Sequence, residues 1–212
     1  HLKKNIIKIN LNIDQKKELE KLTCKKNKAN KIWGWKDPRT CLFLKDYETI
    51  LNDSAFYLVI YRDFDSVVNS LMNRALKQRN FSYEKKHVIQ KWIKKSHFFG
   101  NKNFYSEISP DLINIFSKAW IHYNYEILNH ISSIDSSRYR IVNYSILQNK
   151  SDLILDWLNL NEFSLDKIDC NDYIQENLIS NSKNKINISD DLREEVIDIN
   201  NKYSSLLSNQ NL

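Results

Sequence analysis

The segment Ala55–Tyr61, AFYLVIY, most constrains how this chain folds, because it is a nearly continuous apolar run that ends at a charged residue. Its β-branched and aromatic residues are typical of a parallel strand covered on both faces. Arg62 follows at the carboxyl end, and DFDSVVNSLMNRAL then has a helical pattern. Because ligands of open α/β sheets bind beyond the carboxyl ends of strands, the sequence predicts an anion site at Arg62.

The predicted helix after Arg62 has a face of short polar side chains. Ser66, Ser70 and Asn73 stand at i, i+4 and i+7, with apolar residues beside them. Side chains in the first turns of a helix point back toward its amino terminus, so these hydroxyls can approach a phosphate that Arg62 holds. The alternative is an ordinary solvated helix face with a surface arginine.

A second segment, Trp33–Arg39 with the sequence WGWKDPR, also predicts a short strand that ends in basic residues. Pro38 prevents a helix from starting earlier and favours an extended Asp37, which puts Lys36 at the tip of the strand. Lys36 and Arg39 are then candidates to face one crevice. The alternative is a plain strand-to-helix turn in which Asp37 pairs with Arg39 or caps the helix.

The pairing of WGWKDPRTCLFL with YLVIYRDFDSVVNSLMNR resembles the sulfotransferases that use 3′-phosphoadenosine 5′-phosphosulfate (PAPS), especially their bacterial-type branch. The resemblance implies that Arg62 and Ser70 bind the 3′-phosphate of this donor. The chain has Phe64 where the family usually has proline, and Ser66 where it usually has an acidic residue.

A third block, Tyr139–Asn161, resembles the family's strand that ends in Tyr-Glu-Asp-Leu and the helix after it, although the acidic pair and a later glycine are missing. By this resemblance Tyr144 contacts the bound nucleotide. The alternative role for Tyr144 is a core tyrosine at the end of the sheet.

The resemblance implies an α/β fold, a P-loop-NTPase-like parallel sheet flanked by helices. It implies transfer of the sulfuryl group from PAPS to a hydroxyl or amine of a small molecule, carbohydrate or other acceptor, without a metal. Lys36 is at the family position of the catalytic cation that stabilises the leaving phosphate, and Arg39 is assigned to substrate binding. The base that takes the acceptor's proton is not assigned.

The family's glycine-containing loop for the 5′-phosphosulfate has no counterpart, because Gly34 and Gly100 are the two glycines and neither opens a helix after an apolar strand. We therefore expect an N-terminally truncated fragment, which by itself need not be active. Two alternatives are a noncatalytic nucleotide-binding or interaction module that keeps only the 3′-phosphate half of the site, and a P-loop kinase relative. The kinase alternative lacks a Walker-type Gly-Lys-Ser loop.

Length and composition predict one domain over residues 1–212. No stretch approaches the roughly twenty apolar residues of a membrane span, and three scattered cysteines favour a reducing, provisionally cytoplasmic, compartment. The net charge of +6 suits an anionic donor, but 25 of the 32 basic residues are lysines spread along the chain, so nucleic-acid binding is not expected. Oligomeric state is left open.

Periodicity and capping residues predict helices between and after these strands. A further helix is expected to start after the N-cap Ser189, with Asp190 and Asp191 in its first turn, and to reach about Leu207. The other predicted helices are Asp14–Lys26, Thr40–Leu51, Asp65–Lys77, Tyr83–Phe98 and Asp111–Ile131.

Overall fold

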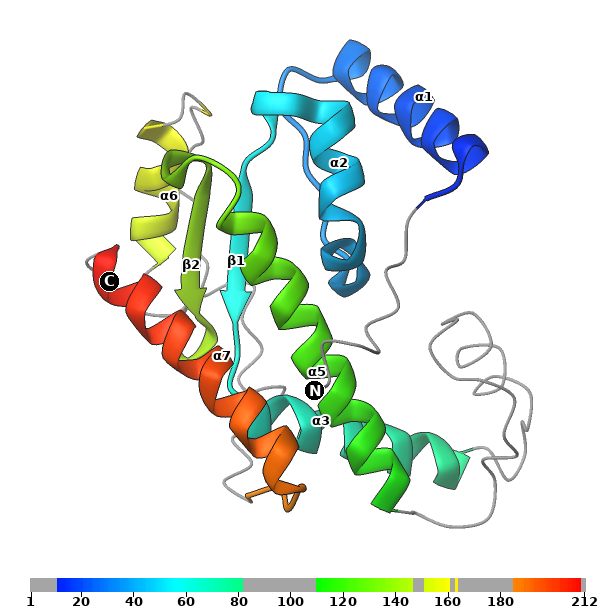
Figure 1. The fold of residues 1–212 in the computed structure, drawn as a ribbon. Helices are drawn as coiled ribbons and strands as arrows, with labels where there is room; N and C mark the ends of the chain where they lie inside the picture. The colour runs from blue at the N-terminus through cyan, green and yellow to red at the C-terminus, as the bar shows by residue number, and fades with distance from the viewer. Residues whose placement is uncertain (1–10, 82–109, 147–150, 161–162, 164–184, 211–212) are drawn as a thin grey trace. The chain divides into compact units, whose positions relative to one another are not determined.

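The structure, a computed structural model, describes residues 11–81, 110–146, 151–160, 163 and 185–210 (Figure 1). These residues form mainly helices together with a small parallel sheet of two strands. The helices are α1 (Ile13–Ala29), α2 (Leu44–Leu51), α3 (Phe64–Phe81), α5 (Pro110–Ile131), α6 (Ser151–Leu160) and α7 (Asp190–Asn209), with short 3-10 turns η2 (Pro38–Phe43), η3 (Asn52–Ser54), η4 (Ser136–Arg138) and η5 (Tyr144–Ile146). The strands are β1 (Tyr57–Tyr61) and β2 (Tyr139–Asn143).

The chain divides into two compact units. The first consists of His1–Ile7, Asp63–Ile121 and Ser180–Val196. The second, which contains the sheet, consists of Lys8–Arg62, His122–Ile179 and Ile197–Leu212. The boundary between the units falls within α5 and within α7, and the expectation of a single domain stays a prediction.

Most predicted helices are confirmed. Pro110 occupies the first position of α5, where its missing N–H costs nothing. The first turn of α7 begins with Asp190 and Asp191, and the Arg193 N–H donates to the carbonyl of Ser189 at 3.0 Å, as expected of an N-cap. The Thr40–Leu51 helix forms as two pieces, η2 and then α2. The predicted helix Tyr83–Phe98 lies outside the described residues.

A parallel sheet is present, as predicted, and it pairs β1 with β2. β1 and β2 run side by side in the same direction, with Tyr57 opposite Tyr139 and Tyr61 opposite Asn143 (Figure 1). Parallel neighbours need a long crossover connection, and helices supply it here. The α/β prediction holds in this coarse form: a helical chain with a small parallel sheet.

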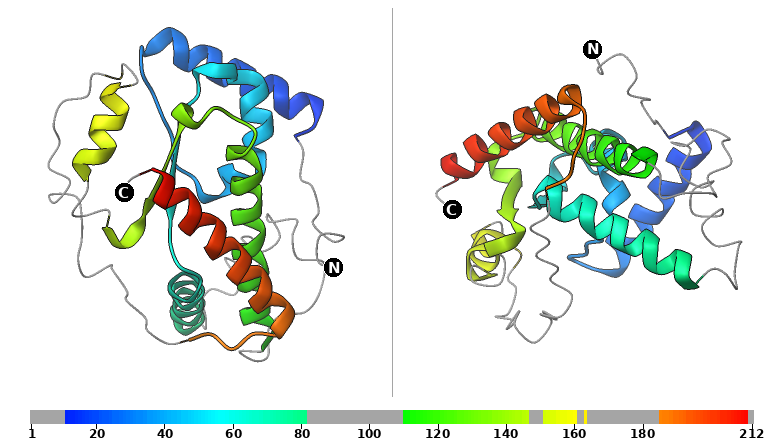
Figure 2. Two further views of the ribbon diagram at one scale, coloured as in Figure 1. Left: turned by 60° about the vertical axis from the view of Figure 1, so that its left-hand side comes forward. Right: turned by 90° about the horizontal axis from the view of Figure 1, so that it is seen from below.

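The predicted strand at Trp33 is wrong: residues 33–37 are extended but pair with no strand among the described residues. The Trp33 and Trp35 rings, on the same side of the extended segment, stack with centroids 5.3 Å apart, and Trp35 lies 4.7 Å from the Tyr47 ring of α2. Ring packing against α2 therefore holds this segment. Figures 1 and 2 show it running in the same direction as β1.

The expectation that β1 is covered on both faces is wrong as well. On one face the Tyr61 ring stacks on Tyr203 of α7 at 4.2 Å, and its hydroxyl donates to Asn200 Oδ1 at 2.6 Å. On the other face Leu58 and Ile60 are 40% and 45% exposed. In the described part of the chain, cover is seen at the start of that face, where Phe56 meets the edge of an α6 tryptophan, Trp157.

The first unit has its own apolar core. Phe64 and Val68 on α3 are buried, and the Phe64 ring meets Trp120 of α5 edge to face with centroids 5.4 Å apart. Asp65 ties this helix to the segment before α7, because its Oδ1 accepts the Ile186 N–H at 2.8 Å. These contacts position the amino-terminal half of α3.

A buried arginine joins the beginnings of the two strands in the second unit. The Arg138 guanidinium donates to both carboxylate oxygens of Glu48, at 2.7 and 3.0 Å, and to the carbonyls of Asn52 and Ala55, at 2.8 and 3.0 Å. Desolvation alone would raise the pKa of Glu48, but hydrogen bonds from Arg138 and Tyr57 outweigh it and hold that pKa below its usual range.

We expect acidification to destabilise the protein through His130, which is 8% exposed, with Nε2 3.8 Å from a Glu48 carboxylate oxygen. Burial lowers the pKa of His130, and the Glu48 charge opposes this only in part. The unfolded chain therefore takes up a proton first, so the free energy of unfolding falls as the pH drops below about 6.5. Urea denaturation at pH 7.5 and pH 5.5 should show a smaller loss for His130→Gln than for the wild type; equal losses would contradict this.

None of the helices in the described part of the chain is long and apolar enough to cross a membrane.

Candidate functional site

Two residues that were predicted to bind the sulfuryl donor directly follow the two paired strands. Tyr61 and Asn143 are the last paired residues of β1 and β2, so Arg62 and Tyr144 are the next residues at the same edge. This is the carboxyl edge of the strands, where parallel sheets present ligand sites. The backbone register thus brings to one edge two residues that the resemblance assigns to the nucleotide.

The side chains of Arg62 and Tyr144 are in contact. The guanidinium carbon of Arg62 lies over the Tyr144 ring, 4.9 Å from its centroid, and both residues are half-buried. A cation over an aromatic ring is attracted by the negative charge of the ring face. The Tyr144 ring therefore supports the Arg62 guanidinium at the strand ends.

A polar residue that the sequence did not single out shapes the turn at Tyr144. Asn143 Oδ1 accepts the backbone N–H of Ser145 at 2.9 Å and its hydroxyl at 2.7 Å. An asparagine that hydrogen-bonds two residues ahead fixes a local turn. Asn143 thus sets the direction in which the chain leaves β2 and places Tyr144 next to Arg62.

Lys36 and Arg39 lie together at the start of η2, on either side of Asp37. The Asp37 carboxylate accepts Arg39 Nε at 2.9 Å and Nη2 at 2.6 Å, and it also caps η2 by accepting the Arg39 backbone N–H at 2.8 Å. Chiefly because of the hydrogen bond from the Arg39 side chain, the pKa of Asp37 falls to about 2. The geometry matches the simpler alternative for Arg39, a pair with Asp37.

The charged group of Lys36 is more available to a ligand than that of Arg39. Two of the Arg39 donor groups already bind Asp37, so a substrate would have to use the remaining ones. Lys36 is exposed and forms no ion pair with any carboxylate in the described part of the chain. Of the two, Lys36 is the cation ready to meet an anionic group.

Ser70 belongs to the first unit, where it is half-buried on the second turn of α3. The amino terminus of that helix carries its own anion, since Asp63 Oδ1 accepts the Ser66 N–H at 2.8 Å. An aspartate just before the first helical residue is the sequence signal for this cap, and the helix prediction did not use it. The predicted place of Ser70 beside a phosphate stays a prediction.

Comparisons with known proteins identified no relative of the chain. No protein-family model, no curated protein and no solved structure matches the chain. Two groups define the chemistry of the candidate site: a ring-supported arginine at the carboxyl edge of a parallel sheet, and an exposed lysine at the end of an extended segment.

Proposed function

We propose that the chain is a PAPS-dependent sulfotransferase with a P-loop-like sheet, and that Arg62 and Tyr144 hold the nucleotide of the donor. The observation that carries the proposal is the Arg62 guanidinium over the Tyr144 ring, directly after two paired parallel strands. A planar donor fork suits a phosphate dianion, which accepts two hydrogen bonds at once. An adenosine 3′-phosphate supplies such a group.

The reaction moves a sulfuryl group in line from a phosphate oxygen of PAPS to the acceptor. The bond between sulfur and the phosphate oxygen breaks, a bond between sulfur and the acceptor oxygen or nitrogen forms, and the acceptor loses its proton. Negative charge grows on the leaving phosphate of 3′-phosphoadenosine 5′-phosphate (PAP). Lys36, without a carboxylate partner in the described part of the chain, is the cation we assign to that charge.

In this proposal Ser70 adds a hydroxyl to the 3′-phosphate, and Arg39 contacts the acceptor with the donors that Asp37 leaves. The base stays unassigned. His122 and His130 on α5 are both buried, and burial lowers the pKa of each, but His130 faces Glu48, the carboxylate that Arg138 binds. The proposed acceptor is a hydroxyl or amine of a small molecule, a carbohydrate or another compound.

The proposal is tested by incubating the purified chain with PAPS and a panel of alcohols, amines and sugars, and by measuring PAP release together with the sulfated product by mass spectrometry. Product that depends on both PAPS and the acceptor supports transfer. Tight PAP binding without any product would instead favour a noncatalytic nucleotide-binding module. If the chain neither binds PAP nor forms product, both the sulfotransferase and the nucleotide-binding module are contradicted.

The Tyr144 ring should contribute more to the affinity for PAP than the Tyr144 hydroxyl does. We expect Tyr144→Leu to weaken PAP binding about fivefold, because the ring that orients Arg62 is lost. Tyr144→Phe keeps the ring and should bind PAP within about twofold of the wild type. Calorimetric titration of the two variants measures this, and equal losses in both would show that the ring does not orient the arginine.

A further inference from the structure

The two long faces of α1 differ in what they contact. One face is joined to the rest of the second unit: Lys16 Nζ lies 2.8 Å from Asp46 Oδ1, Thr23 is buried, and Asn27 Oδ1 accepts the Trp33 indole N–H at 2.6 Å. The other face carries exposed lysines at i, i+4, i+8 and i+11, a spacing that places them on one side of a helix. They are Lys17, Lys21, Lys25 and Lys28, here called the lysine face.

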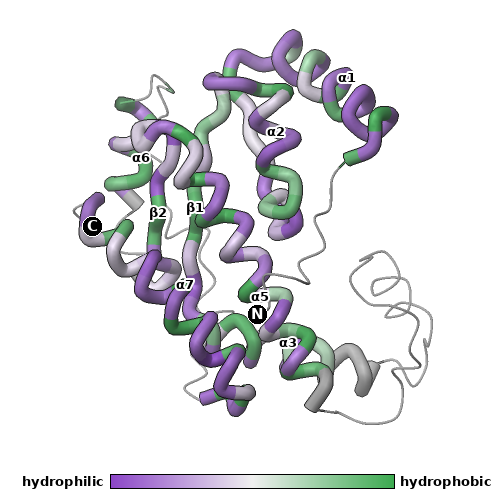
Figure 3. The backbone as a smooth tube through the Cα atoms, in the orientation of Figure 1, coloured by the Kyte–Doolittle hydropathy of each residue, from purple (hydrophilic) through white to green (hydrophobic). Residues whose placement is uncertain are grey.

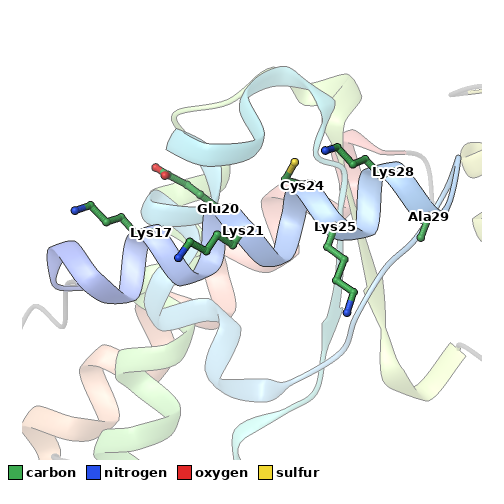
Figure 4. A pocket seen from close by; sticks show the side chains of 7 residues that line it. All are labelled: Lys17, Glu20, Lys21, Cys24, Lys25, Lys28 and Ala29. Carbon is green, nitrogen blue, oxygen red and sulfur yellow. The ribbon is translucent and has the colours of Figure 1, made fainter.

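The lysine face lines an open groove. The four lysines, with Glu20, Cys24 and Ala29, border an open space of about 740 Å³, and Figure 4 shows that all seven residues come from this one helix. In the described part of the chain, Lys16 is the α1 lysine that forms an ion pair, and none of the four on this face does. None of the four lysines is therefore held in a close ion pair within the described structure, although Glu20 lines the same groove.

Asp14, Glu18 and Glu20 each stand three positions from a lysine of this face and offset part of the repulsion between its like charges. Lysines four residues apart are neighbours on a helix and repel each other. They also form a regular row, with about 6 Å of helix axis between successive charges from Lys17 to Lys25. Such a row matches an extended polymer that carries an anionic group at regular intervals.

We propose that the lysine face of α1 binds a linear anionic polysaccharide that carries carboxylate or sulfate groups. A nucleic acid is less suited, because α1 contains no aromatic residue for base stacking and no arginine. A membrane surface is also less suited. The exposed apolar residues Ile13 and Leu22 are nine positions apart, on opposite sides of the helix, and Figure 3 shows α1 as mostly hydrophilic.

This inference goes beyond the proposed sulfotransferase and does not rest on it. The lysine face uses none of the residues assigned to the donor or to catalysis. A chain that binds no PAP can still bind the polysaccharide, and the reverse also holds. A result that contradicts PAP binding therefore leaves polysaccharide binding open, and one that contradicts polysaccharide binding leaves PAP binding open.

The test is calorimetric titration with a size-defined heparin octasaccharide in low salt. We expect Lys21→Gln with Lys25→Gln to weaken binding about tenfold, because two exposed ionic contacts are lost while glutamine keeps the helix propensity. The matched control replaces Lys26 and Lys45 by glutamine; both are exposed, lie outside the groove and remove the same charge. Circular dichroism checks that both variants keep their helix content.

Two comparison ligands decide between classes of partner: a single-stranded thymidine 20-mer and vesicles of phosphatidylserine. The proposal predicts that the octasaccharide binds more tightly than either, with an affinity that falls as salt is added. It is overturned if the DNA or the vesicles bind as tightly, if the control pair weakens binding as much as the Lys21 and Lys25 pair, or if the octasaccharide does not bind.

Discussion

Replacing Arg138 by methionine should lower the free energy of unfolding by about 3 kcal/mol, the largest stability effect we expect from one substitution. Arg138 is 7% exposed, and it binds both carboxylate oxygens of Glu48 and the carbonyls of Asn52 and Ala55. Methionine fills similar space but donates nothing, so two carbonyls lose the arginine donor and the Glu48 carboxylate keeps the Tyr57 hydroxyl. Urea denaturation at pH 7.5 measures the loss.

Two further variants make this result specific. Arg140→Met changes a half-buried arginine on β2 and should cost less than about 1 kcal/mol, since Arg140 forms no ion pair in the described part of the chain. The Glu48→Met change should cost less in the Arg138→Met background than in the wild type, because the pair is then already broken. Equal losses from Arg138→Met and Arg140→Met would contradict a structural role for the cluster.

The largest effect on activity should come from Lys36→Ala, which we expect to lower the rate of sulfuryl transfer about 100- to 1,000-fold. The lysine is exposed, and in the proposed reaction its charge meets a phosphate oxygen that becomes more negative in the transition state. Binding of PAPS should weaken far less than the rate, because the ground state carries less of that charge. Single-turnover kinetics with saturating PAPS separates the two quantities.

The control for Lys36 is Lys45→Ala, an equal loss of charge at an exposed position of α2. Its transfer rate should stay within about twofold of the wild type. Lys36→Arg should recover part of the rate, since a positive charge remains although its shape differs. A Lys36→Ala rate within threefold of the wild type would remove this residue from the mechanism.

Local signals predicted much of the fold. The proline at the start of α5 and the paired aspartates at the start of α7 fix helix ends through the backbone groups they cap or omit. The Trp33 strand was predicted wrongly because strand formation needs a partner, which the segment itself cannot specify. The exposure of Leu58 and Ile60 was not predicted for a similar reason: a strand can have the same apolar sequence whether one or both of its faces are covered.

Part of the candidate site could also be predicted from the sequence. The contact between Arg62 and Tyr144 follows from two strand ends that parallel pairing brings to one edge. The pair between Asp37 and Arg39 was weighed as an alternative because the residues are two apart. Arg138 was not singled out, since its partners are 83 to 90 residues away in the sequence.

The most direct test of the central claim, a 3′-phosphate site at Arg62, is calorimetric titration of the chain with PAP and with 5′-AMP, repeated on Arg62→Ala. We predict that the wild type binds PAP at least about thirtyfold more tightly than 5′-AMP, the value of a charge-assisted contact to the 3′-phosphate, and that Arg62→Ala removes most of this preference. Equal affinity of the folded wild type for the two nucleotides, or a preference that survives in Arg62→Ala, would contradict the claim.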